Sequence, residues 1–404
     1  MTGGTPTLAD DRRTVWRLAF LGLAGSLVGN GLARFAYTPL VPVLVEEGWL
    51  TTAEAGYLGA FNYAGYFVGA LTGLWVGRRM KIGHAAVFSL ALCAVSLFMV
   101  AIDWGFWWMV PWRFLAGYGA GVVMVLVPPS ILRQLPSERW GFATAGVSAG
   151  IGIGIAVSGT VIPQLAKLGA TASWLGLAVA ASVFTVALLV LWREPPPLPA
   201  RPTAEFRQIR LPAILLCTAY GLFAVAIAAY SIFWVDFLAR EVGLGLAAGG
   251  FHWTVLGTCS LGAPLLAGWL ATRHGFGKVL SLLLAVTGIG TLLPVFSDAS
   301  PLLYLSSALG GVLFVGVMTL FSGRTAEIAG REGQQKLWWI MTLLFAIGQS
   351  GGSWGLSALY DVTLAYRPLF ALAGGALLLG AILTLPALAR AFAPPDADSP
   401  AKPA

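Results

Sequence analysis

Charge is scarce in this 404-residue chain, in which Asp, Glu, Lys and Arg together make up 10% of the residues. Soluble domains carry roughly a quarter charged residues, so this composition excludes an ordinary water-soluble protein. The hydrophobic fraction is 58% and the mean hydropathy is +0.82. Apolar runs of about 20 residues recur along the sequence, each long enough to cross a hydrocarbon core of about 30 Å. We therefore predict an all-α protein embedded in a lipid bilayer.

Cysteine and histidine are also rare, with three of each. Cys93, Cys217 and Cys259 lie inside apolar runs, and the sequence has no CxxC motif or Cys/His cluster. We therefore expect no metal site, no disulfide and no cofactor. HExxH and paired-carboxylate motifs are missing too, which argues against a membrane enzyme. The polar start of the chain leads into a run too long for a signal peptide, so we expect no cleaved leader.

Twelve membrane-spanning helices account for the apolar runs. We place them at 15–43, 53–76, 84–102, 105–132, 139–166, 173–192, 212–237, 248–271, 277–297, 300–322, 335–358 and 367–389. A proline-rich polar stretch divides them six and six and predicts an extended linker. The expected organisation is a tail at 1–14, a six-helix bundle at 15–192, a linker at 193–211, a second bundle at 212–389 and a tail at 390–404.

Lysine and arginine are distributed unevenly between the two sides that this topology predicts. Nineteen fall in the segments on the side of the termini, and three, Lys167, Arg240 and Arg367, fall on the opposite side. The positive-inside rule then predicts that both termini are cytoplasmic. The net charge of +7 is on this interpretation a topological signal rather than a nucleic-acid-binding surface.

The chain also contains an internal repeat. "GLWVGRRMKIG" begins at Gly73 and "GWLATRHGFGK" at Gly268, 195 residues later, so that Arg78 corresponds to Arg273. "EEGWLTTAEAG" and "EVGLGLAAGG" precede these segments in the same register. Two related halves are typical of transporters in which the halves rock about a central site. The repeat favours such a carrier over a channel.

The first pair of segments resembles the signature between helices 2 and 3 of the major facilitator superfamily. The matching residues, which the resemblance implies act in gating, are Gly73, Arg78, Lys81, Gly268, Arg273 and Lys278. The acidic residue of that signature is replaced by Gly77 and Thr272, which questions the gate contact that the acid makes. "RFLAGYGAG" at 113–121 is similar to the superfamily's fourth-helix motif.

A narrower resemblance rests on three further segments. "GLARFAYTPLVPVL", "AGYLGAFNYAGYFVGAL" and "AIGQSGGSWG" resemble the YbfB/YjiJ group of the superfamily. The resemblance implies a transporter of the bacterial cytoplasmic membrane, built as two pseudo-symmetric six-helix bundles, with poorly defined substrates.

Arg34 lies near the middle of the first predicted span. Ser26, Asn30 and Thr38 share its four-residue spacing, which predicts a polar stripe with Tyr37 beside it. An arginine at this depth costs free energy unless it faces water or a partner. We hypothesise that its guanidinium binds an anionic group of the cargo. The alternative is a structural arginine held by backbone carbonyls or by Asn30.

Arg113 is the second arginine inside a span, and Ser307 occupies its place in the second half. It is interpreted either as a coupling or electrostatic residue or as an interhelical anchor. Acidic residues are missing from the middle of every span. The interior therefore carries net positive charge, which favours an anionic cargo such as a carboxylate and disfavours cations. Asp236 and His252 are the candidates for proton coupling, with ordinary interfacial residues as the alternative.

Aromatic and amide residues complete the predicted binding site, with packing or a membrane-interface belt as the alternative for each. They are Asn62, Tyr63, Tyr66, Tyr220, Tyr230, Trp253, Gln349 and Ser353. Gly146, Gly150, Gly152 and Gly154 predict a surface for close helix packing and rocking. We expect a monomeric secondary transporter whose partners are a small-molecule substrate, a coupling proton and the lipid bilayer. The alternative is a proton-driven exporter of drugs or metabolites.

Overall fold

The structure is a computed structural model that describes residues 12–136, 139–195 and 211–385. Residues 1–11 of the tail predicted at 1–14, the whole tail predicted at 390–404 and most of the predicted linker lie outside the described residues. The helices of the first half are α1 (Arg12–Ser26), η1 (Leu27–Leu32), η2 (Phe35–Leu40), α2 (Val41–Glu46), α3 (Thr52–Arg79), α4 (Ile82–Met99), α5 (Phe106–Leu132), α6 (Trp140–Leu165), η4 (Ala166–Leu168) and α7 (Ala170–Leu191). Those of the second half are α8 (Leu211–Asp236), η5 (Phe237–Glu241), α9 (Gly245–His274), α10 (Phe276–Phe296), α11 (Ser300–Gly311), η6 (Val312–Val317), α12 (Met318–Thr363) and α13 (Arg367–Leu383).

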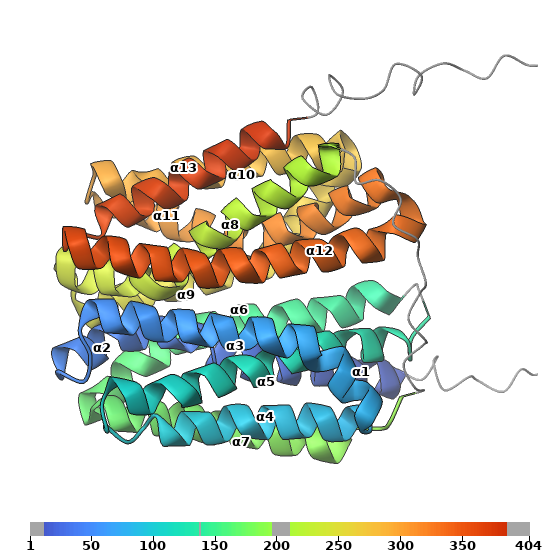
Figure 1. The fold of residues 1–404 in the computed structure, drawn as a ribbon, viewed down its shortest axis with the longest axis horizontal. Coiled ribbons are helices and arrows are strands. Elements are labelled where there is room, and N and C mark those ends of the chain that lie inside the picture. Colours follow the sequence, from blue (N-terminus) through green and yellow to red (C-terminus); the bar gives the residue numbers. More distant parts are fainter. Residues whose placement is uncertain (1–11, 137–138, 196–210, 386–404) are drawn as a thin grey trace, which may run out of the picture.

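The all-helical membrane fold predicted from composition is confirmed. Within the described ranges there is no strand, and nine helices are long and apolar enough to cross a membrane. The helix α3, the second part of α12 and the shorter α13 complete the predicted twelve. In Figure 1, α1–α7 lie on one side of the molecule and α8–α13 on the other. Each side has its own apolar core, and Phe35, Tyr63 and Ile155 of the first half belong to the core of the second.

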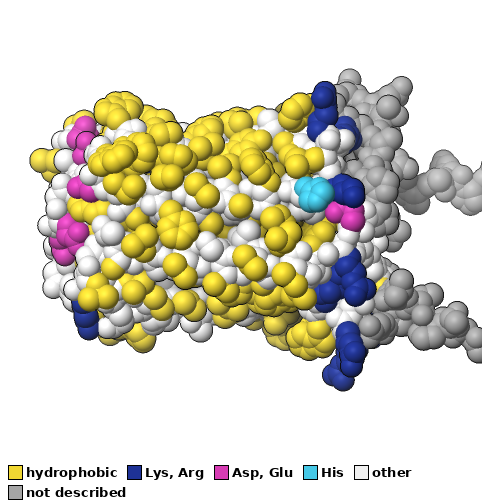
Figure 2. Space-filling view, turned by 90° about the horizontal axis from the view of Figure 1, so that it is seen from below, with side chains coloured by type: hydrophobic (Ala, Val, Ile, Leu, Met, Phe, Trp, Pro, Cys, Tyr) yellow, Lys and Arg dark blue, Asp and Glu magenta, His cyan; other side chains and the backbone are white. Residues whose placement is uncertain are grey.

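The two ends of the molecule differ in charge. Figure 2 shows most of the Lys and Arg side chains at one end, most of the Asp and Glu side chains at the opposite end, and an apolar band between them. We call these the basic end and the acidic end. Exposed Trp, Phe, Leu and Val side chains cover the band. An apolar band of this kind is expected where a helical protein faces the hydrocarbon core of a bilayer, which contains no water to solvate polar groups.

Matching helix caps at the acidic end show the repeat in three dimensions. The Glu47 carboxylate accepts a hydrogen bond from the Ala170 N–H at the start of α7, at 2.9 Å. The Glu241 carboxylate accepts one from the Tyr366 N–H just before α13, also at 2.9 Å. A carboxylate at a helix N-terminus satisfies a free N–H group and complements the helix dipole. Corresponding loops therefore fix corresponding helices in the two halves.

The first span is not the continuous helix predicted for 15–43. The α-helix ends at Ser26, a π-helical turn follows, and Arg34 takes φ −117° and ψ −66° before the 3₁₀-helix η2. Glycines in η1 weaken the helix, and Pro39 cannot donate a backbone hydrogen bond and excludes the carbonyl four residues earlier. The break leaves the carbonyl of Ala33 free to accept hydrogen bonds from other helices.

The tenth and eleventh predicted helices are joined by helix rather than by the loop expected at 323–334. The helix α12 continues on both sides of Gly330, whose φ of 64° breaks the helical geometry. Glycine adopts this left-handed conformation without steric cost. The last helix, α13, ends at Leu383, before the predicted end at 389.

The glycines of α6 serve two different contacts. A Cβ atom on Gly150 would meet Ser26 Oγ at 2.1 Å, and one on Gly154 would meet Gly31 Cα at 2.4 Å, both within the first half. A Cβ on Gly159 would meet the Gly250 carbonyl oxygen of α9, in the second half, at 2.4 Å. The predicted close packing is thus within one bundle for Gly150 and Gly154, and between bundles for Gly152, whose Cβ would meet Leu261 of α9 at 2.5 Å. Gly159, which sequence reasoning did not select, also packs between bundles.

We expect Gly159→Leu and Gly150→Leu to fail in different ways. A bulky side chain at Gly159 pushes the bundles apart, so transport falls while the folded amount stays near that of the wild type. At Gly150 the clash cannot be relieved by bundle movement, so the protein loses stability, at about 1–3 kcal/mol for overpacking. Thermal unfolding of the purified variants, measured beside transport, separates the two effects. Equal unfolding midpoints for both variants would contradict this assignment.

Candidate functional site

The Arg34 side chain lies between the two halves and is 5% exposed. Its Nη1 donates to Asn30 Oδ1 at 2.7 Å, within the same broken span. Its Nη2 donates to Gln349 Oε1 at 2.5 Å, and Gln349 belongs to α12 of the second half. One guanidinium therefore connects two side-chain amides from opposite bundles.

The partners of Arg34 are all neutral. The ion pairs formed by the described residues involve Arg240, Arg324 and Arg367, and none includes Arg34. Arg34 Nε and Gln349 Nε2 are buried and have no hydrogen-bond partner among the described residues. A buried charge with neutral partners is costly, and an unpaired buried donor adds to that cost. The site therefore offers hydrogen-bond donors and positive charge to an acceptor.

Aromatic rings surround the guanidinium. Its Cζ lies 4.0 Å from the ring centroid of Tyr66, 4.9 Å from that of Tyr63 and 5.2 Å from that of Phe35. Phe35 meets Phe314 of η6 with ring centroids 5.3 Å apart. Phe314 in turn meets Trp253 of α9 at 5.9 Å. The Nε1 atom of Trp253 is a further buried donor without a described partner.

Two hydroxyl groups dock the first half on α8 beside this cluster. Thr38 Oγ1 donates to the backbone carbonyl of Ser231, and the Tyr63 hydroxyl is hydrogen-bonded to the Ser231 side chain. All three residues are buried. The predicted polar stripe is not a single face, because Ser26 donates to the Val147 carbonyl of α6 at 2.7 Å instead. The π-helical turn between Ser26 and Arg34 has more residues per turn than an α-helix, so the Ser26 and Arg34 side chains point to different faces.

Arg113 supports the break in the first span. Its Nη1 donates to the freed Ala33 carbonyl at 2.9 Å. Asn62 Nδ2 donates to the Arg113 carbonyl at 2.9 Å and to Ala33 at 3.4 Å. The guanidinium Cζ also lies 4.3 Å from the Tyr37 ring centroid. This geometry matches the anchor interpretation of Arg113 and places Asn62 and Tyr37 with it.

Other predicted binding residues lie apart from Arg34. The Tyr37 hydroxyl donates to the Ala55 carbonyl at 2.9 Å. Tyr220 packs among aromatic rings of the second half, with Phe321 at 4.7 Å between centroids. The Tyr230 hydroxyl is 2.8 Å from Ser306 Oγ, and Ser353 Oγ donates to the Gln349 carbonyl at 2.7 Å. The structure thus groups Asn30, Tyr63, Tyr66 and Gln349 around Arg34, with Trp253 beyond Phe314, and places the other residues in packing positions.

Phe35, Phe314 and Ser231 line the site although sequence reasoning did not select them. Phe35 is next to Arg34 in the chain, so its position in the sequence could have indicated that it lies near the site. Phe314 and Ser231 come from η6 and α8 and meet the first half only through the tertiary fold.

Asp236 is fully buried near the acidic end rather than exposed at an interface. It accepts a hydrogen bond from the Tyr366 hydroxyl and lies 3.2 Å from Arg240 Nη1. Arg240 Nη1 also donates to Thr52 Oγ1 of α3, in the first half, at 2.9 Å. Burial and the neighbouring carboxylate raise the pKa of the Tyr366 hydroxyl, which keeps it a donor. Arg240, paired with Asp236 in the second half, therefore links the two halves at this end through its hydrogen bond to Thr52.

His252 is also buried, but it contacts neutral groups. Its Nδ1 is 2.9 Å from Ser307 Oγ, and its ring stacks on Tyr304 with centroids 4.1 Å apart. Ser307 also accepts a hydrogen bond from Trp234 Nε1 at 3.1 Å. The position equivalent to Arg113 thus holds a neutral network in the second half.

The predicted gating residues lie at the basic end. Arg78, Lys81, Arg273 and Lys278 are exposed, and the Arg273 guanidinium lies 4.0 Å from the Trp269 ring centroid. Glu194, at the end of the described first half, accepts hydrogen bonds from the N–H groups of Ile82 and Gly83 at 2.6 and 3.0 Å. An acidic residue therefore caps the helix that follows "GLWVGRRMKIG", although the motif itself lacks one.

Comparison with known proteins agrees with this architecture. Residues 26–385 match the family described as "Uncharacterised MFS-type transporter YbfB". A putative metabolite transport protein of Haemophilus influenzae is 24% identical, covering 93% of this chain and 95% of that protein. The uncharacterized MFS-type transporter YcaD of Shigella flexneri serotype 5b is 23% identical over 74% of this chain and 79% of its own. The cis,cis-muconate transport protein of Acinetobacter baylyi is 27% identical over 37% of each chain, so this match spans little more than a third of that relative.

A solved structure supports the same fold. The D-xylose–proton symporter structure superposes with a TM-score of 0.72 and 16% identity, covering 95% of this chain and 98% of that one. An identity this low shows the fold alone. The family match covers most of the chain and includes both halves and the residues around Arg34. The chain therefore belongs to the YbfB-type transporters of the major facilitator superfamily.

Proposed function

We propose that this transporter carries a small organic anion, such as a carboxylate, across the cytoplasmic membrane by alternating access. The observation that carries the proposal is the Arg34 guanidinium, which is buried between the halves with neutral partners only and an unpartnered Nε. Arg113 adds a second buried positive charge nearby, and the described ion pairs include neither arginine. A carboxylate at Arg34 relieves this charge, since guanidinium and carboxylate form paired, charge-assisted hydrogen bonds.

The hydrogen bond between Arg34 and Gln349 is the contact between the halves that the cargo would replace when it binds. Because the two residues belong to opposite halves, rocking of the halves strains or breaks this bond. A carboxylate oxygen is a stronger acceptor for a guanidinium than an amide oxygen and can replace Gln349 Oε1. The free Gln349 amide then donates to the cargo. Tyr63, Tyr66 and Phe35 supply the apolar walls that such sites use.

The contact between Asp236, Arg240 and Thr52 supports Asp236 as the coupling residue. Protonation of this buried carboxylate removes its charge attraction to Arg240, whose Nη1 links the halves through Thr52. The proton thus changes the strength of a contact that must open and close during transport. His252 lies among neutral groups and offers no such link. We therefore favour Asp236 over His252.

The charge difference between the ends supports a cytoplasmic basic end by the positive-inside rule. On this orientation the acidic end, with Asp236, faces the outside. On this orientation Arg78 and Arg273 lie on the cytoplasmic side, which is where residues that gate the cytoplasmic opening are expected.

A ligand screen by thermal unfolding tests the proposal. The purified protein is heated with small carboxylates, amines and neutral sugars, and cis,cis-muconate is the first probe because one relative is named as its transport protein. We expect a carboxylate to raise the unfolding midpoint, since a ligand at 100 times its Kd stabilises by about 2.7 kcal/mol. Stabilisation by amines alone would contradict an anionic cargo.

A further inference from the structure

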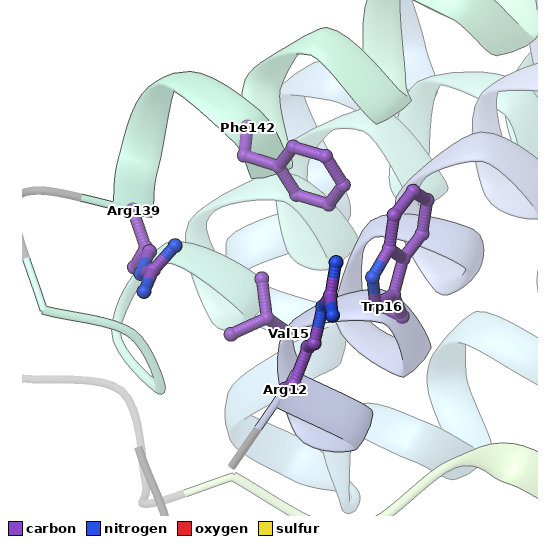
Figure 3. A pocket seen from close by; sticks show the side chains of 5 residues that line it. All are labelled: Arg12, Val15, Trp16, Arg139 and Phe142. Atoms are coloured by element: carbon purple, nitrogen blue, oxygen red, sulfur yellow. The ribbon is translucent and has the colours of Figure 1, made fainter. Parts of the chain in front are cut away.

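A pocket at the basic end lies outside the site around Arg34. It has a volume of about 260 Å³ and is lined by Arg12, Val15, Trp16, Arg139 and Phe142. Figure 3 shows the two arginines on either side of Val15, with Trp16 and Phe142 beside them. Trp16 and Phe142 meet edge to face with ring centroids 4.8 Å apart.

The pocket opens on the outer surface of the first half. On α1, Ser26 and Gly22 face α6, where Val147 receives the Ser26 hydroxyl. Phe20 and Arg17 face α7, through Phe184 and the Leu191 carbonyl. Trp16 lies on the helix face between these two rows, by the 3.6-residue period. This face is the one a bilayer covers.

The side chains in the pocket divide into a charged and an apolar part. Arg12 and Arg139 are exposed, and their guanidinium groups make no hydrogen bond or ion pair with described residues. Trp16 is 58% exposed and Phe142 is 40% exposed. The helix α6 begins next to Arg139 without a side-chain cap, so its first N–H groups and its dipole add positive potential. Charge at the surface and aromatic rings below it match the layers of a phospholipid.

We propose that this pocket binds an anionic phospholipid. The two guanidiniums bind the phosphodiester of the headgroup, and an acyl chain lies along Trp16 and Phe142. Basic pockets between transmembrane helices are known to hold anionic headgroups. The apolar wall favours the lipid over free phosphate, which has no group to place on the two rings. The proposal is independent of the cargo at Arg34.

Native mass spectrometry of the purified full-length protein tests this site. The wild type is titrated with phosphatidylglycerol and with phosphatidylcholine, and the bound fractions give the affinity of the first lipid. We expect phosphatidylglycerol to bind more tightly than phosphatidylcholine. The double variant R12Q/R139Q should lose at least about tenfold in affinity for phosphatidylglycerol, since each arginine near a membrane surface contributes up to about fivefold. The variant R12K/R139K keeps the charges and should retain part of the preference.

The matched control is R79Q/R193Q, which removes two exposed arginines from the same end that do not line the pocket. Its affinity for phosphatidylglycerol should stay within about twofold of the wild type, within the scatter of a surface-charge effect. Soluble glycerol phosphate is added as a competitor. Equal affinity of R12Q/R139Q and the wild type would overturn the proposal. Displacement of the lipid by glycerol phosphate at comparable concentration would overturn it too, because the site would then recognise a free anion.

Discussion

Replacing Arg34 with Ala is expected to abolish carboxylate binding while leaving the fold intact. The change removes the guanidinium that we propose pairs with the cargo. Removing one member of a buried charge pair costs about 2–5 kcal/mol, which is at least about 30-fold in affinity. The measurement is uptake by proteoliposomes of the carboxylate that stabilises best in the screen, with the apparent affinity taken from its concentration dependence.

Arg34→Lys separates charge from shape. Lysine keeps a positive charge but not the planar fork that contacts Asn30 and Gln349 together. We expect transport between that of the wild type and that of Arg34→Ala. Arg79→Ala is the matched control, since Arg79 is exposed at the basic end beside Trp75. Wild-type affinity in both Arg34 variants would show that the residue is structural.

Replacing Asp236 with Asn is expected to uncouple transport from the proton gradient. Asparagine has the shape of a protonated aspartic acid and can still accept from the Tyr366 hydroxyl, but it cannot form an ion pair with Arg240. Accumulation driven by an imposed pH gradient should fall to the level without a gradient. Exchange of labelled for unlabelled cargo at equal pH should persist, because exchange needs no net proton movement.

Titratable and charged groups around Asp236 affect how readily its carboxylate takes up a proton. Arg240 and Tyr366 contact it directly, and Glu46 of the first half influences it electrostatically. Asp298→Asn is the matched control, because Asp298 pairs with Arg367 at the same end and its side chain is 48% exposed. Gradient-driven accumulation by Asp236→Asn at the wild-type level would exclude Asp236 as the coupling residue.

The fold could be predicted from the sequence because its signals are strong and local. Apolar runs of membrane length give the helices, and the offset of 195 residues between two glycine-led segments gives the repeat. The helix break at Arg34 was not predicted, although Gly29, Gly31 and Pro39 are residues that weaken a helix. Hydropathy does not distinguish a regular helix from a π or 3₁₀ turn, since both consist of the same apolar residues.

The candidate site could be predicted only in part. Asn30 and Arg34 are four residues apart, so their contact follows from local geometry. Gln349 is 315 residues from Arg34, and no local pattern indicates which of its faces meets the first half. Tyr220 and Tyr230 were expected at the site but lie in the core of the second half. From Phe223 onwards α8 is almost wholly apolar and buried, so its sequence has no polar stripe that shows how the helix is rotated.

Arg113 illustrates a different limit. Its depth in the span indicates a function or an anchor, and sequence alone does not choose between them. The structure gives it the Ala33 carbonyl, which is free only because the first span breaks there. The partner of Arg113 could therefore not be predicted without first predicting the break.

The most direct measurement compares the affinity of one carboxylate with that of its uncharged amide, by calorimetry, on the wild type and on Arg34→Ala. If a negative group docks at this guanidinium, the wild type prefers the acid by at least about 30-fold and the variant binds both compounds with similar, weak affinity. A preference for the acid that survives intact in Arg34→Ala would contradict the account.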